Sequence, residues 1–392
     1  MDYNPLSPEV RLDPYPYYEE LRRDHPAYLT PLGAYAISRY DDVNYLLMSP
    51  QLFSSTAMPT FNINDQPVAT VINSDPPDHT RLRNLVNRAF TPKIIADLEP
   101  RIREITAQLI DRVAAAGEMD LVADLATPLP VTIIAELLGV EPERGEDFKR
   151  WSDNVVLQIG ASQEDAERMD QELEGFSEYF QDAVEERRRH PKGDVISALV
   201  RAEEQQQALT SDQVLGFIGL LLIAGNETTT NLLGNAMLAL LQHPDQLRLV
   251  LEEPSLIPNV VEEALRYDAP VQFLFRVTTR EVEIAGTKLP QGAAVLPLFG
   301  SANRDDRRYP NAARFDVTRD AQGHVAFGHG IHFCLGAPLA RLETRIALEA
   351  LLSRLRNFAL ADPQVERIDS IFLRGPKRLR LTFEPAAVPA EA

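Results

Sequence analysis

Residues 327–336 read Phe327-Gly328-His329-Gly330-Ile331-His332-Phe333-Cys334-Leu335-Gly336 and hold the single cysteine of the 392 residues. A helical pattern follows, from Ala337 to Leu352. A lone thiol cannot form an intramolecular disulfide or a multi-cysteine metal site. It can bind one metal as a thiolate, act as a nucleophile, or be buried as a small hydrophobe. The glycines allow tight turns, and the positive end of the helix dipole favours the thiolate.

The pattern Phe-Gly-x-Gly-x-His-x-Cys-x-Gly in this stretch resembles the haem-binding loop of the cytochrome P450 family, the haem-thiolate monooxygenases. The resemblance implies that Cys334 is the axial thiolate on the iron of haem b, iron protoporphyrin IX. It implies that Phe327 packs beside the sulfur and that Gly330 and Gly336 keep the loop close to the porphyrin. Gly328 is a further candidate for binding the cofactor. His332 is expected to contact a haem propionate.

Composition narrows the class of protein. The net charge is −19, from 39 basic and 58 acidic residues, which makes nucleic-acid binding a poor hypothesis because that binding neutralises phosphates. The N-terminus has no signal-peptide pattern, and the longest apolar stretch, Val214 to Gly225, is too short to span a bilayer. We expect a soluble cytoplasmic protein without disulfides or a membrane anchor.

The fold class predicted is mainly α with a smaller β-rich region. The resemblance implies one cytochrome P450 domain over residues 1–392, with a long central helix over a buried haem and a disordered tail at 385–392. Strand signals occupy Val271 to Leu298 and Asn357 to Phe383. Helical patterns cover Pro14–Asp24, Asp42–Met48 with Asp41 as N-cap, Pro92–Ala116, Leu129–Leu138, Glu143–Ile159 and Gln163–Arg188. By analogy, residues 151–180 form a lid over the substrate channel.

The central helix is predicted from a capping box at Thr210-Ser211-Asp212-Gln213 to Gln242, a length of about 50 Å. Its apolar middle contains Ala224-Gly225-Asn226-Glu227-Thr228-Thr229. Polar residues inside a buried helix need partners or a function, unless Glu227 and Thr228 face solvent. The stretch resembles the acid–alcohol pair of the family. This implies that Thr228 hydrogen-bonds the oxygen being activated, that Glu227 relays protons through water, and that Ala224 and Gly225 leave space for oxygen.

Two further groups of residues are interpreted through the resemblance. His79 and Arg83 share one helix face at i, i+4, which usually means a solvated face. By the resemblance, His79, Arg83 and Arg276 match residues that bind the haem propionates. An arginine fork and an imidazole suit a carboxylate chemically. Glu263 and Arg266 lie at i, i+3, a spacing that is common on helix surfaces. By the resemblance, they match a buried structural network that Arg314 completes.

The predicted substrate pocket is apolar, which favours a fatty acid, terpenoid or steroid and leaves a macrolide-like product, free or carrier-bound, open. The stretch 51–73 either faces substrate or packs on the surface. The candidate lining residues are Met58, Phe61, Val71, Ile72, Leu221, Val271, Phe273, Leu274, Ile371 and Phe372.

The function implied is insertion of one oxygen atom from O2 into a hydrophobic small molecule, by hydroxylation or epoxidation. NAD(P)H supplies electrons through a ferredoxin or flavodoxin and its reductase, since no flavin or iron–sulfur signature occurs. We expect a monomer. Candidate docking residues for an acidic ferredoxin are Arg101, Arg103, Arg307, Arg308 and Arg341.

Three alternatives remain open at this point. The first is a peroxide-driven haem-thiolate peroxygenase, against which retention of Glu227 and Thr228 argues. The second is a non-enzymatic haem-based sensor or ligand-binding protein, which would leave that pair without a purpose. The third is a cysteine hydrolase pairing Cys334 with His332 or His329, although a histidine so near in sequence is a poor general base for its neighbour.

Overall fold

The computed structural model describes residues 3–58, 61–63, 66–87, 90–145, 147–148, 150–151, 163–202 and 209–385. Its contacts divide the chain into two compact units. Unit 1 comprises Met1–Phe53, Leu98–Leu129 and Thr228–Ala392, and unit 2 comprises Ser54–Asp97 and Pro130–Glu227. Most of the predicted helix Glu143–Ile159, the first part of the predicted lid and nearly all of the predicted tail lie outside the described residues. The single domain stays a prediction.

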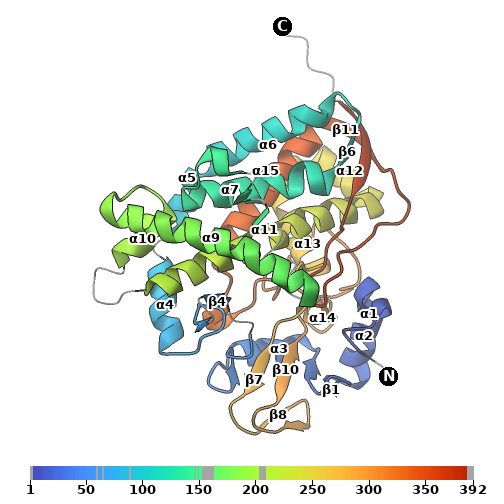
Figure 1. Cartoon of the computed structure of the whole chain (residues 1–392). Coiled ribbons are helices and arrows are strands. Elements are labelled where there is room, and N and C mark those ends of the chain that lie inside the picture. The colour runs from blue at the N-terminus through green and yellow to red at the C-terminus, as the bar shows by residue number, and fades with distance from the viewer. Residues whose placement is uncertain are drawn as a thin grey trace. The chain divides into compact units, whose positions relative to one another are not determined.

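The chain is mainly helical with a smaller β-rich part, as the sequence predicts (Figure 1). The α-helices of unit 1 are α1 Pro8–Leu12, α2 Tyr15–Asp24, α3 Tyr40–Leu47, α6 Glu99–Ala114, α12 Pro244–Glu252, α13 Ile257–Tyr267, α14 Phe299–Ala302 and α15 Ala337–Arg354. Those of unit 2 are α4 Asp78–Val86, α5 Pro92–Asp97, α9 Gln163–Arg189 and α10 Val195–Ala202. The helices α7 Pro128–Leu138 and α11 Ser211–Gln242 run through both units.

A five-stranded sheet has the strand order β1-β2-β10-β7-β3. Its strands are β1 Ala27–Leu29, β2 Tyr35–Ile37, β3 Phe53–Ser54, β7 Arg276–Thr278 and β10 Ala294–Pro297. The strand β10 pairs in parallel with β2 and antiparallel with β7, where Val295 lies opposite Arg276. The adjacent hairpin is β8 Val282–Ile284 with β9 Thr287–Leu289. The strand content predicted for Val271 to Leu298 is therefore confirmed.

At another part of unit 1, α15 packs against α6 and α13 (Figure 1). A three-stranded sheet joins β11 Leu355–Leu360, β12 Arg380–Pro385 and β6 Glu118–Asp120 in the order β11-β12-β6. Ile346, Leu348 and Leu351 of α15 are buried. The segment after Cys334 is thereby fixed to a core element.

Unit 2 contains the hairpin β4 Phe61–Ile63 with β5 Gln66–Val68, which the sequence did not predict. The helix predicted over Pro92–Ala116 is two helices, α5 and α6, because the chain breaks at Leu98 and Pro100 lies in the first turn of α6. The predicted helix Gln163–Arg188 is confirmed as α9. It is joined to α10 partly by Arg187, whose Nε donates to Asp194 at 2.8 Å.

The start of α11 confirms the predicted capping box. The N–H of Thr210 donates to Oε1 of Gln213 at 3.2 Å, and the N–H of Gln213 donates to Oγ1 of Thr210 at 3.2 Å. The cap predicted at Asp41 is wrong, since α3 begins at Tyr40. The N–H of Tyr40 donates instead to the distant Asp305 at 3.0 Å. Among the helices described, none is long and apolar enough to cross a membrane.

Candidate functional site

The loop around Cys334 is closed by its own backbone. The N–H of Cys334 donates to the carbonyl oxygen of Phe327 at 2.9 Å. Gly328 and Gly330 have φ of 66° and 71°, a region that glycine enters without strain. A Cβ on Gly330 would lie 2.6 Å from the carbonyl oxygen of Leu47. The half-buried thiol therefore lies just before the N-terminus of α15, whose dipole favours a thiolate.

Arg341 anchors this loop to α13. Its guanidinium lies 4.6 Å from the ring centroid of Phe327 and donates to both carboxylate oxygens of Glu262, at 2.6 and 2.9 Å. Burial opposes ionisation of Glu262, but hydrogen bonds from His324 and Arg341 lower the pKa of its carboxyl to about 2. The ionised pair holds the base of the loop against α13.

The residues present at the loop fit a haem. Cys334 offers one thiolate, a soft ligand that suits an iron whose other ligands belong to a prosthetic group. In the part of the chain that the structure describes, no three His, Cys, Asp or Glu side chains gather to hold a metal by themselves. A Cβ on Gly336 would meet no atom within 4 Å, so the chain beside the thiol presents an open face to a flat group.

The middle of α11 is polar and partly accessible. Asn226, Thr229 and Thr230 are buried, whereas Glu227 and Thr228 are half-buried and Ala224 is exposed. Glu227 and Thr228 are thus neither sealed in the core nor fully solvent-facing.

Gly225 has a packing role that the sequence interpretation missed. A Cβ at this position would lie 2.9 Å from Cδ1 of Ile134 in α7, so the missing side chain makes room for α7. The exposed neighbour Ala224 is the position that leaves open space at this level of the helix. The sequence could not separate the two small residues, because only the position of α7 does so.

The four candidate propionate contacts lie in both units. In unit 2, His79 is buried and Arg83 half-buried on α4. In unit 1, Arg276 is a buried guanidinium on β7 that donates to the carbonyl of Phe275 at 2.7 Å, and His332 is half-buried in the Cys334 loop. Their convergence on one pair of carboxylates stays a prediction.

The candidate pocket residues of unit 1 come from two segments that lie side by side. The N–H of Gln272 donates to the carbonyl of Phe372 at 2.7 Å, and Val271 bridges Leu373. Val271, Leu274, Ile371 and Phe372 are half-buried. In unit 2, Met58, Val71 and Leu221 are buried, Ile72 is half-buried, and the side chain of Phe61 lies outside the described residues.

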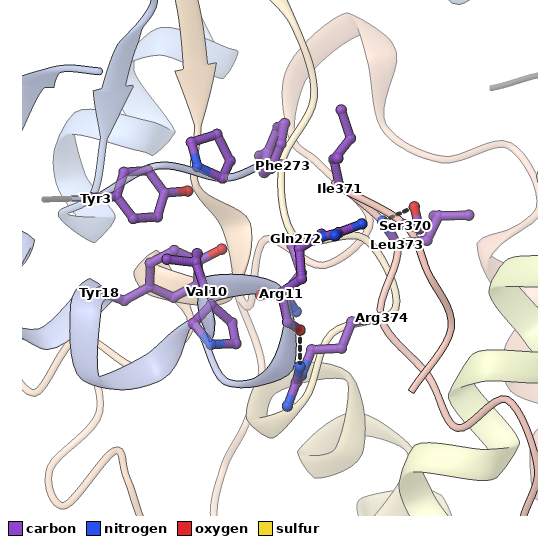
Figure 2. Close-up of a pocket in the computed structure, with 12 residues that line it drawn as sticks. Tyr3, Val10, Arg11, Tyr18, Gln272, Phe273, Ser370, Ile371, Leu373 and Arg374 are labelled. Carbon is purple, nitrogen blue, oxygen red and sulfur yellow. Dashed lines mark hydrogen bonds between the residues drawn. The ribbon is translucent and has the colours of Figure 1, made fainter. Parts of the chain in front are cut away.

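Phe273 and Ile371 line a small pocket together with the N-terminal segment. Figure 2 shows Tyr3 and Tyr18 on one side of it and Ile371 on the other. Phe273 is 2 % exposed and belongs to an aromatic and aliphatic cluster with both tyrosines. The sequence did not indicate this N-terminal lining, because no local pattern links residue 3 to residue 273.

The predicted network of Glu263 and Arg266 is present and fully buried. Arg266 donates through Nε and Nη2 to the two oxygens of Glu263, at 2.7 and 2.8 Å. The prediction that Arg314 completes this network is wrong. The side chain of Arg319 reaches Glu263 at 3.4 Å, whereas Arg314 is exposed and contributes its carbonyl oxygen to Arg266. Arg319 was missed because it lies in irregular chain without a periodic signal.

Glu343 on α15 is a buried acid that the sequence interpretation also missed. It is 1 % exposed, and no described residue pairs with its Oε1. Burial raises the pKa of its carboxyl to about 8. The folded chain therefore holds a proton here that the unfolded chain loses above about pH 4.5, and stability is lost as pH rises from there to about 8.

Substitution Glu343→Gln is expected to remove this loss. The unfolding free energy of the variant minus that of the parent should rise on the order of 1.4 kcal/mol per pH unit between pH 5 and 8. Denaturant titrations at several pH values measure it. A difference that does not change with pH would show that Glu343 has an ordinary pKa.

The cytochrome P450 family model matches residues 27–383. Cytochrome P450 109 of Bacillus spizizenii is 42 % identical over 388 residues, which cover 96 % of this chain and 94 % of the relative. The vitamin D(3) 25-hydroxylase of Pseudonocardia autotrophica is 41 % identical over 386 residues, covering 95 % and 94 %.

Solved structures agree with these matches. Cytochrome P450 CYP109Q5 from Chondromyces apiculatus superimposes with a TM-score of 0.92 at 44 % identity, covering 99 % of each chain. CYP109E1 from Bacillus megaterium, in complex with corticosterone, superimposes with a TM-score of 0.88 at 38 % identity. The superposition covers 95 % of this chain and 99 % of that one. P450BioI in complex with an acyl carrier protein ligated to hexadec-9Z-enoic acid superimposes with a TM-score of 0.89 at 35 % identity. The superposition covers 96 % of this chain and 99 % of that one.

Proposed function

The chain belongs to the cytochrome P450 family, and from this premise we propose that Cys334 binds the haem iron and that the substrate is a hydrophobic small molecule. The enzyme is a haem-thiolate monooxygenase, an oxidoreductase that incorporates one atom of O2 into its substrate. Haem is its cofactor, and NAD(P)H is used indirectly, as is typical of the family. We further propose that it works as a monomer in the cytoplasm.

Five side chains of this chain are proposed to hold the haem. Bound haem would supply an iron centre at which a thiolate ligand favours O–O cleavage. Cys334 provides the ligand, and the open face at Gly336 and the dipole of α15 support it. His79, Arg83, Arg276 and His332 are proposed to bind the two propionates, which a guanidinium fork and an imidazole suit.

Glu227 and Thr228 are proposed as the catalytic pair. The carboxyl of Glu227 gives a proton to water, and Oγ1 of Thr228 orients that water. The half-buried position of both residues supports this role, because a proton relay needs contact with water on one side and a defined geometry on the other. Ala224 leaves room beside the pair.

The substrate class is proposed to be a steroid or a similar lipophilic molecule. The half-buried apolar residues of the adjoining segments 271–274 and 371–372 support it. One relative is named as a vitamin D(3) hydroxylase, and one similar structure holds corticosterone. Corticosterone is therefore the first compound to test for a spin-state shift of the ferric protein, followed by a fatty acid bound to acyl carrier protein.

A ferredoxin or flavodoxin is proposed as the electron donor. Five arginines of unit 1 are candidate contacts, and four already have acidic partners: Arg101 with Glu104, Arg103 with Glu99 and Glu349, Arg307 with Asp305, and Arg341 with Glu262. Arg308 lies over the rings of Tyr40 and Tyr309. An arginine that bridges two acids can still present charge outward at a surface.

Charge reversal at Arg101 and Arg103 is expected to slow reduction by an acidic ferredoxin by about tenfold at low salt, and to weaken the salt dependence of the rate. Stopped-flow reduction at several ionic strengths measures both. Lys288→Glu, on an exposed hairpin, is the control. Unchanged rates and an unchanged salt slope in the double variant would exclude this surface.

The observation that carries the proposed function is the backbone-closed loop that holds the single thiol at the N-terminus of α15. The test is the carbon monoxide difference spectrum of the reduced protein, in which we expect the band typical of thiolate-ligated haem. Protein purified without haem would end the proposal. Turnover with hydrogen peroxide that far exceeds turnover with redox partners would favour the peroxygenase instead.

A further inference from the structure

The loop 367–376 carries Ile371 and Phe372, two of the proposed substrate contacts. Its two ends pair with each other, and its tip lies along the segment 271–274, to which the backbone contacts described above join it. The loop forms neither a helix nor a strand, so its position depends on the parts of the chain that pack against it. Its neighbour on the other side therefore affects the shape of the proposed pocket.

That neighbour is the N-terminal segment, residues 3–18. The guanidinium of Arg374, in the loop, donates to the carbonyl oxygens of Arg11 and Leu12 at 3.2 and 3.0 Å. In the opposite direction, the guanidinium of Arg11 pairs with the carboxylate of Asp369. The N-terminal segment and the loop are thus tied together by side chains from both.

Arg374 is also held by Asp268, which lies three residues before Val271. The Nε of Arg374 donates to Oδ1 of Asp268 at 2.9 Å, and the hydroxyl of Tyr15 donates to the same oxygen at 2.6 Å. Arg367 donates to the other carboxylate oxygen at 3.2 Å. Burial opposes ionisation of Asp268, but the charges of Arg374 and Arg367 lower the pKa of its carboxyl to about 2. One buried ionic network therefore joins both substrate segments to the N-terminal segment.

An aromatic cluster covers the back of the same segments. Tyr3 is fully buried, its ring centroid lies 5.9 Å from that of Tyr18, and both belong to one buried cluster with Phe273. Ile371 and Phe372 pack against this cluster. Tyr3, Phe273 and Ile371 also line the small pocket in Figure 2, so the N-terminal segment bounds the space behind the two substrate segments. A smaller side chain at position 3 would let Phe273 and Ile371 shift into that space.

We propose that the N-terminal segment is a specificity determinant, because it holds the loop 367–376 and the segment 271–274 where they contact an apolar ligand. This rests on the proposed function, in which both segments line the substrate pocket. Arg374 and Tyr3 are positioning residues, which act through the side chains that they hold. A pocket wall that is fixed in advance costs less free energy on binding than a wall that the ligand must order.

Two haem ligands of different size test this without knowledge of the substrate. Imidazole is too small to need the pocket walls, whereas 4-phenylimidazole also buries a phenyl ring against them. In spectral titrations of the haem-loaded ferric protein, Tyr3→Ala and Arg374→Lys are each expected to raise the dissociation constant of 4-phenylimidazole about tenfold, the equivalent of about two buried methylene groups. The dissociation constant of imidazole should stay within about twofold of the parent value. Lysine keeps the charge beside Asp268 but cannot reproduce the forked contacts of the guanidinium.

Three further variants separate positioning from stability. Tyr3→Phe keeps the packed ring and should retain the parent ratio of the two dissociation constants. Leu109→Ala opens a cavity in α6, at a buried position of the same unit, and should lower the unfolding temperature without changing that ratio. Arg11→Ala breaks only the partly exposed pair with Asp369, so it should fold and raise the dissociation constant of 4-phenylimidazole about twofold. A change of the ratio in Leu109→Ala as large as in Tyr3→Ala would assign the N-terminal segment a structural role and overturn the proposal.

The carbon monoxide spectrum separates failure of this inference from failure of the proposed function. The thiolate band retained in every variant, together with the parent ratio of dissociation constants in Tyr3→Ala, Arg374→Lys and Arg11→Ala, would overturn the inference alone. Absence of that band in the parent protein would overturn both.

Discussion

Cys334→Ser is expected to abolish the thiolate band in the carbon monoxide spectrum and to reduce monooxygenase activity to background. A neutral hydroxyl is a poor ligand for haem iron and cannot supply the electron density of a thiolate. The fold should survive, because the backbone N–H of residue 334, not its side chain, closes the loop onto Phe327. For the haem-free proteins, the change in unfolding free energy should be within about 1 kcal/mol.

Three measurements on the same preparation check this expectation. Haem content, the carbon monoxide spectrum and the denaturation midpoint distinguish lost ligation from lost folding. The exposed Phe333 next to the cysteine offers a control, since Phe333→Leu changes the loop surface without touching the ligand. A serine variant that keeps the thiolate band would show that Cys334 is not the ligand.

Glu263→Gln is expected to have the largest effect on stability. Glu263 and Arg266 are both fully buried, and the carboxylate also accepts the N–H of Asp316 at 2.8 Å. Removing the negative charge leaves a buried guanidinium without its counter-ion, which costs about 3–5 kcal/mol. We expect little soluble protein at 37 °C, and a much lower urea midpoint for the protein obtained at lower temperature.

Matched variants make this result interpretable. Glu281→Gln breaks an exposed pair with Lys288 and should change the unfolding free energy by less than about 0.5 kcal/mol. Replacing both buried partners, as Glu263→Leu with Arg266→Met, should recover part of the loss because no lone charge remains. Equal midpoints for Glu263→Gln and Glu281→Gln would contradict a structural role for the buried pair.

The parts of the fold that the sequence predicted correctly depend on local signals. The capping box at Thr210 needs only residues three apart, and α9 and α15 follow from helical periodicity. The cap of α3 could not be found in this way, because its acceptor is the carboxylate of Asp305, 265 positions away. A helix terminus that is capped by a residue distant in sequence has no capping pattern in the adjacent sequence.

The candidate site shows the same division. The residues around Cys334 and the pair Glu227 and Thr228 come from short motifs and are found without a structure. Three further findings depend on packing: the arginine that reaches Glu263, the contact of Gly225 with Ile134, and the contacts of Arg374 with the N-terminal segment. An arginine in a loop looks like any other charged residue until the structure shows that it is buried and what it contacts.

The buried arginine of α13 also determines how the irregular segment after α14 can open. Arg266 donates to the carbonyl oxygens of Asn303, Ala312 and Arg314, and Glu263 accepts the N–H of Asp316. These backbone groups cannot be released to solvent unless α13 moves with them. In amide hydrogen exchange, Asp316 should therefore exchange at the slow rate of the helical core, although it lies in a segment without helix or strand.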